Sequence, residues 1–96
     1  MIQIRQDTGG DPLTFTVTIR EGKSETRHAV TMAQADFARL SAGEHKATEI
    51  IDAAFRFLLD REPKEAILAR FDVTVISRYF PDFASTLPRY LSPPGK

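Results

Sequence analysis

Hydrophobic and polar residues alternate strictly along one segment near the start of the chain. Every second residue from 13 to 19 is apolar and threonines stand between them, the apolar set being Leu13, Phe15, Val17 and Ile19. This period-two alternation places the apolar side chains on one face of a β-strand. Weaker alternation flanks it over residues 2–5 and 24–30, with turn-forming residues in both gaps. The pattern predicts a three-stranded antiparallel meander with one face on a core.

The spacing of hydrophobic residues changes to that of helices after Val30. Thr31, with Gln34 three residues later, has the form of a capping box at a helix start. Gly43 is placed to end this first helix. The segment therefore predicts a short helix that begins just after Thr31.

The strongest helical pattern covers residues 48–59. Thr48 is a suitable N-cap, and Glu49 lies in the first turn, where the helix dipole favours a negative charge. Apolar residues occupy most of the circumference and leave one polar stripe, formed by Glu49, Asp52, Arg56 and Asp60. A helix this apolar must be covered on more than one side. We expect the sheet to cover one side and the C-terminal segment another.

Prolines divide the C-terminal third into short segments. Pro63 suits the first position of a helix over 64–70. Asp72 can cap a second helix over 73–80, although residues 73–77 have strand-like composition, and a strand there is the alternative.

Pro81 stops that second helix, and Asp82 starts a last turn through Leu87. The tail over 88–96 holds three of the six prolines, and we expect it to be disordered.

Together these elements predict an α+β fold, a three-stranded antiparallel meander followed by three to four helices packed on one sheet face. The 96 residues fit a single domain, here over residues 1–87. The expected core consists of Phe15, Val17, Ile19, Phe37, Ile51, Ala54, Phe55, Leu58, Ile67, Phe71 and Ile76.

Charge and composition narrow the classes of function. Thirteen basic residues balance thirteen acidic ones, so nucleic acid is a poorly matched partner. No cysteine is present, which excludes disulfides, thiolate catalysis and cysteine-based metal sites. No apolar stretch approaches the roughly 18 residues of a membrane span. We expect a cytoplasmic protein with no membrane association.

One run of residues resembles a known family. Residues 55–65, Phe-Arg-Phe-Leu-Leu-Asp-Arg-Glu-Pro-Lys-Glu, are followed by Ile67-Leu68, Phe71-Asp72, Ile76 and Tyr79-Phe80-Pro81. This half of the chain resembles a family of short, uncharacterised bacterial proteins that also begin with a strand-rich segment. The resemblance implies a bacterial source and a stand-alone small protein. It implies no activity and no functional residues.

Residues 64–80 partly match a helix–turn–helix. Ile76 to Tyr79 gives the ending typical of a recognition helix, which would place three side chains toward a DNA groove, Thr74, Ser77 and Arg78. Asp72 stands where the turn glycine is expected, and no basic excess supports phosphate contacts. DNA binding through this segment is therefore the alternative hypothesis.

The candidate chemistry elsewhere favours structural roles. His28 and His45 are the two histidines, and most metal sites need three or four ligands, so we expect half-exposed histidines and no metal. The charged cluster at a helix end, Asp60, Arg61 and Glu62, is expected to solvate the helix terminus or to make a structural ion pair rather than an acid–base centre. The sequence contains no phosphate loop and no nucleophile motif. We predict no enzymatic activity and no cofactor.

Five of the nine aromatic residues lie within the last 26 positions. Aromatic residues are enriched at interface cores. The candidate interaction surface consists of Tyr79, Phe83, Leu87, Tyr90 and Leu91. The leading hypothesis is a small noncatalytic protein-interaction or accessory module that binds an unknown protein or a second copy of itself. A small-ligand binder or an enzyme is a further alternative.

Overall fold

Three antiparallel strands form the first third of the chain, as predicted. The computed structural model describes residues 1–91, and its strands are β1 (Ile2–Thr8), β2 (Leu13–Glu21) and β3 (Ser24–Met32). In their register, Ile4 lies opposite Val17, and Phe15 lies opposite Val30. Residues on opposed positions share a sheet face, so these apolar side chains meet on one side.

A fourth strand extends the sheet to the order β1-β2-β3-β4. β4 (Arg70–Asp72) runs parallel to β3, with Val30 opposite Phe71. The sequence predicted only three strands, and a three-residue strand is too short to show alternation. The strand alternative over 73–77 was wrong, since those residues begin a helix.

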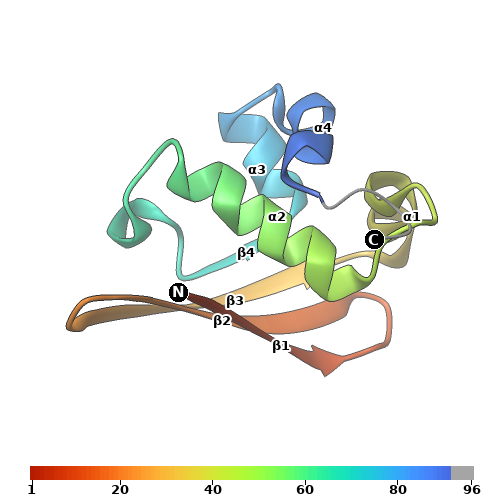
Figure 1. Cartoon of the computed structure of the whole chain (residues 1–96). Helices are drawn as coiled ribbons and strands as arrows, with labels where there is room; N and C mark the ends of the chain where they lie inside the picture. Colours follow the sequence, from red (N-terminus) through yellow and green to blue (C-terminus); the bar gives the residue numbers. More distant parts are fainter. Residues whose placement is uncertain (92–96) are drawn as a thin grey trace.

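The helices lie on one face of the sheet (Figure 1). α1 (Gln34–Ser41) and α2 (Ala47–Leu59) follow β3 directly. The predicted cap at Thr31 was wrong, because Thr31 still belongs to β3, where it pairs with Thr14. Thr48 is likewise inside α2. That helix is capped by the carboxylate of Glu49, which accepts a hydrogen bond from the Lys46 backbone N–H at 2.7 Å.

The C-terminal third consists of short elements packed over α2. The 3₁₀ helix η1 (Lys64–Ala66) precedes β4, and the helices α3 (Thr74–Tyr79) and α4 (Phe83–Thr86) follow it. The predicted helix over 64–70 was wrong beyond its first turn. The 3₁₀ helix η2 (Leu87–Tyr90) shows that the predicted disorder from residue 88 was wrong for this turn. The remainder of that prediction falls on 92–96, which lie outside the described residues.

α2 is buried between the sheet and the C-terminal elements, as its all-round apolar pattern required. Phe55 faces the sheet side and contacts the Phe71 ring at a centroid distance of 5.9 Å. On the other side, the Phe57 ring meets three aromatic rings edge-on, those of Phe80, Phe83 and Tyr90. The expected core is confirmed apart from Phe37, which is only partly buried.

Candidate functional site

A groove opens between the C-terminal end of α2, the segment from η1 to β4, and α3. Its volume is about 380 Å³. Its apolar walls are formed by Leu58, Ile67, Phe71, Val75, Ile76 and Phe80. We call it the α2–α3 groove. Its volume lies within the range of about 300–1,000 Å³ that is typical of binding pockets, and an apolar lining of this kind is also typical of them.

The groove carries exposed hydrophobic side chains at its walls. Leu68 is 47% exposed and Tyr79 is 69% exposed, and both line the groove. In residues 1–91 Met1 is the third large hydrophobic residue with such exposure. Apolar side chains gathered around a hollow in this way are typical of a surface that binds another molecule.

Glu62 contributes a carboxylate to the groove wall. It follows α2, and its side chain is half-buried. Within residues 1–91, no hydrogen bond or ion pair involves this carboxylate, although neighbouring Arg61 is bound to other groups. A partly desolvated carboxylate favours a cationic partner. The groove can therefore hold apolar groups together with one positive charge.

His28 fixes one wall of the groove from beneath. The ring is buried, and its Nδ1 donates a hydrogen bond of 2.8 Å to the carbonyl oxygen of Leu68, since a carbonyl can only accept. Its Nε2 then accepts from the Thr26 hydroxyl at 2.9 Å. The expected half-exposed His28 was therefore wrong. Strand alternation placed this residue on the inner face, where Leu68 supplies the partner that burial requires.

Asp72 fixes the opposite end of β4. Its carboxylate accepts a hydrogen bond of 2.6 Å from the Thr31 hydroxyl and bonds from the hydroxyl and backbone N–H of Thr74. Partial burial acts to raise the pKa of Asp72, but these three bonds outweigh it and hold the pKa below its usual value. Asp72 thereby joins β3 to the start of α3.

Lys64 anchors η1 to the tip of the β2–β3 hairpin. Its side chain is 4% exposed, and its Nζ lies 2.6 Å from Glu65 and 3.2 Å from Glu21. The hydrogen bond to Glu65 is the main cause of the raised pKa of Lys64, and the bond to Glu21 adds to it against the effect of desolvation. The segment before β4 is therefore held at its start by the ion pairs of Lys64 and at its end by the hydrogen bond from His28 to Leu68.

Only part of the predicted interaction surface is exposed. Tyr79 lies on the groove, as described above. Phe83 and Leu87 are each 1% exposed and belong to the core, so their assignment to a surface was wrong. Tyr90 and Leu91 are half-buried and pack against that core. Short helices over residues 83–90 turn these side chains inward, which the proline-rich sequence did not indicate.

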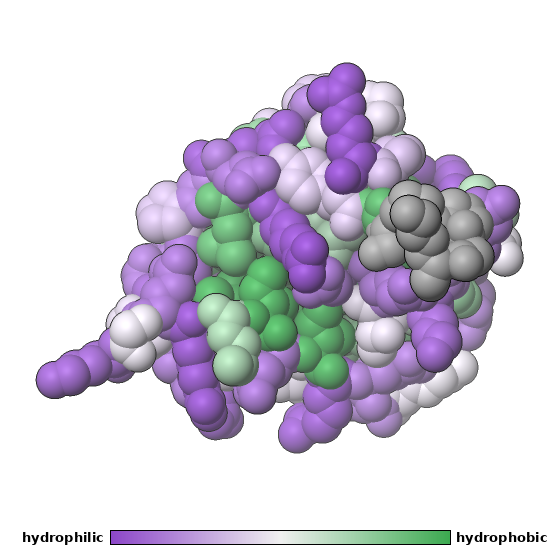
Figure 2. Space-filling view, viewed as in Figure 1, coloured by the Kyte–Doolittle hydropathy of each residue, from purple (hydrophilic) through white to green (hydrophobic). Residues whose placement is uncertain are grey.

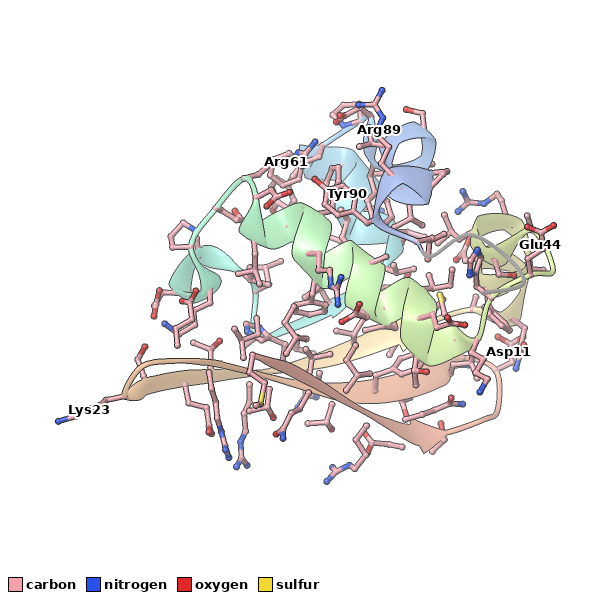
Figure 3. All side chains as sticks on the ribbon, viewed as in Figure 1. Asp11, Lys23, Glu44, Arg61, Arg89 and Tyr90 are labelled. Atoms are coloured by element: carbon pink, nitrogen blue, oxygen red, sulfur yellow. The ribbon has the colours of Figure 1, made fainter. Side chains whose placement is uncertain are left out.

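Tyr90 joins the charged cluster at the end of α2 (Figure 3). Its hydroxyl donates a hydrogen bond of 2.6 Å to Asp60. The Arg61 guanidinium lies 3.6 Å above the Phe57 ring centroid and 3.5 Å from Asp82. These contacts tie η2 and α4 to α2. Arg61 makes a structural ion pair with Asp82, whereas within residues 1–91 no ion pair involves Asp60 or Glu62.

The helix–turn–helix is not formed by residues 64–80. A strand, β4, stands where its first helix should continue. Thr74, Ser77 and Arg78 are exposed on α3. Thr74 is bound to Asp72 at the start of that helix, which has only six residues. The alternative based on a recognition helix therefore loses its structural basis.

Within residues 1–91, no group of three or more histidine, cysteine, aspartate or glutamate residues could hold a metal ion. His45 lies half-buried in the loop before α2. No helix within the same range is long and apolar enough to cross a membrane.

Comparisons with protein-family models, curated proteins and solved structures gave no match to this chain. The resemblance of residues 55–81 to a bacterial family therefore stays a prediction.

Proposed function

We propose that this protein is a noncatalytic protein-interaction module that binds a short peptide segment of its partner in the α2–α3 groove. The observation that carries the proposal is the exposure of Leu68 and Tyr79 on a groove whose walls are apolar. Covering such side chains removes apolar surface from water, which stabilises a complex by about 25 cal/mol for each Å² of apolar surface buried. A cytoplasmic location belongs to this proposal.

The groove chemistry defines the partner segment. Apolar side chains at helical or alternating spacing would fill the hollow between Ile67 and Phe80. A lysine or arginine beside them would meet the carboxylate of Glu62, which has no partner within residues 1–91. The preferred ligand is thus an apolar peptide that carries one basic residue.

A small apolar ligand is the second candidate, because the volume of about 380 Å³ would also suit one. An amine with a hydrophobic tail would use the same walls and the same carboxylate. Peptide binding is favoured because the exposed side chains extend the contact surface beyond the hollow itself.

The test is selection from a random peptide library displayed on phage. Immobilised wild-type protein is the target, and the double variant Leu68→Ser/Tyr79→Ser serves for counter-selection. Both side chains are exposed, so the variant should fold normally. We expect enriched peptides with apolar residues and one lysine or arginine, and at least tenfold weaker binding to the variant by fluorescence anisotropy.

Glu62→Gln provides the matched control for the charge. It keeps the shape of the side chain and removes the negative charge. We expect it to weaken the binding of the selected basic peptides. The binding of peptides in which the basic residue is replaced by a neutral one should not change. Peptides that bind the double variant as tightly as the wild type would contradict the proposal, as would a library that yields no binder.

A further inference from the structure

The free edge of β1 is the second surface of this molecule that is suited to a partner. β1 has seven residues, and within residues 1–91 it pairs only with β2. The backbone N–H of Arg20 bonds to the carbonyl of Met1 at 2.9 Å, so Met1 and Arg20 form a hydrogen-bonded pair. Such pairs alternate with non-bonded ones along an antiparallel ladder. Hence the backbone groups of Ile2, Ile4 and Gln6 point away from β2 and toward the open edge.

Apolar side chains adjoin this edge. Ile2 and Ile4 are only partly buried, and Met1 is 74% exposed. Figure 2 shows a hydrophobic area on this side of the molecule, between β1 and α2. An open edge beside apolar side chains is a ready site for strand addition.

The usual protection of an edge strand is weak here. Within β1 the charged residues are Arg5 and Asp7, and their side chains pair with each other at 2.6 Å. Asp7 also accepts a hydrogen bond from Thr16, which keeps this pair on the outer face of the sheet. The edge therefore carries little net charge to repel another strand, and β1 contains neither lysine nor proline.

We propose that two copies of this chain pair antiparallel through β1 and form one continuous sheet. The backbone pattern is satisfied by the register that places Ile4 opposite Ile4 and Ile2 opposite Gln6. In this register each of these residues meets a partner whose N–H and C=O also point outward. Arg5 faces Gln3 of the second copy. The register shifted by two residues, which centres on Arg5, would place two arginines opposite each other and is disfavoured.

This arrangement keeps the helices of both copies on one face of the joined sheet, because the two-fold axis runs perpendicular to it. The partly buried Ile2 and Ile4 side chains would be covered by their counterparts. The α2–α3 groove lies beside β4 at the other edge and stays open. Self-association is therefore independent of the proposed peptide site.

Sedimentation velocity over a concentration series tests the dimer, with Gln6→Pro as the disrupting variant. Gln6 is exposed, and the ladder alternation directs its N–H away from β2, so proline removes an edge donor along with the side-chain hydrogen bond from Gln6 to the Thr8 carbonyl. Gln6→Ala is the matched control. We expect dimers for the wild type, for Gln6→Ala and for the groove variant Leu68→Ser/Tyr79→Ser. Gln6→Pro should be monomeric with an unchanged circular dichroism spectrum.

Cysteine cross-linking tests the register, because the chain has no native cysteine. Residues in a hydrogen-bonded antiparallel pair lie about 5.5 Å apart between Cα atoms, within disulfide range. We expect Ile4→Cys to form a disulfide dimer under mild oxidation. Gln6→Cys should not, since its counterpart lies four residues along the strand. A monomeric wild type, a dimeric Gln6→Pro or equal cross-linking of the two cysteine variants would overturn the proposal.

Discussion

The two edges of the sheet are held in opposite ways. β1 is seven residues long and pairs with β2 through an antiparallel ladder, whose register shifts between Gln6 and Thr8. β4 has three residues and runs parallel to β3. Its few backbone hydrogen bonds to β3 are supplemented by side chains, because His28 binds the Leu68 carbonyl before the strand and Thr31 binds Asp72 at its end.

This difference relates the length of an edge strand to the kind of partner that the edge can bind. A long edge strand is stabilised by its backbone and leaves its outer groups free for another chain. A short strand must be fixed by side-chain anchors, and those anchors also shape the groove beside it. The β1 edge is thus suited to self-pairing and the β4 edge to a ligand.

The largest expected effect compares one apolar residue from each edge. Phe71→Ala in β4 should lower the free energy of unfolding by about 3–5 kcal/mol, since a buried phenylalanine leaves a cavity. Ile4→Ala in β1 should cost about 1 kcal/mol, because its side chain is only partly buried. Urea denaturation at low protein concentration measures both. Equal losses would show that the two edges are anchored alike.

His28→Leu should have the next largest effect. Leucine fills much of the space but leaves the Leu68 carbonyl without its donor, at a cost of about 1–3 kcal/mol. Because Leu68 lines the groove, peptide affinity should fall as well. Thr26→Val is the control, since it removes only the hydroxyl that His28 accepts from. If peptide affinity is unchanged in His28→Leu, the groove wall at Leu68 does not depend on the hydrogen bond between His28 and Leu68.

Thr31→Val should cost about 1 kcal/mol at neutral pH, because it removes one hydrogen bond to Asp72. The pKa of Asp72 is lowered in the folded state, so its stabilising effect is present above the unfolded-state value of 3.8. That contribution is lost as the pH falls through the lower folded pKa. The stability difference between wild type and variant should therefore shrink on acidification, as thermal melts at neutral and acidic pH would show. A stability difference that does not depend on pH would show that the effect of Thr31→Val does not involve the charge of Asp72.

The regular elements could be predicted from the sequence because their patterns are long. Alternation defined β2, and an apolar pattern over nearly four turns defined α2 with an error of two residues in its N-cap, which is Lys46 and not Thr48. β4 was missed because three residues carry no period. Thr31 was misread because its capping signal competes with the β3 ladder, and its hydroxyl binds Asp72, 41 residues later.

Among the residues that line the groove, only Tyr79 was predicted from the sequence to belong to an interaction surface. The walls of the groove come from α2, η1, β4 and α3, which approach one another through tertiary packing that no local pattern records. Phe83 and Leu87 have the same residue character as interface side chains, and only their helical turns direct them into the core. Leu68 and Glu62 gave no signal of their own, since an isolated leucine or glutamate is common on any surface.

The parallel pairing of β3 with β4 also has a kinetic consequence. The three N-terminal strands connect through short turns, whereas residues 33–69 separate β3 from β4. Contacts between distant residues form late, after most of the loop-closure entropy has been lost. β4 should therefore dock last and detach first, and native-state hydrogen exchange should be faster at Phe71 and Val73 than at Val17. The groove would then open by local unfolding of one wall while the meander stays folded, and a bound peptide would slow exchange at that wall alone.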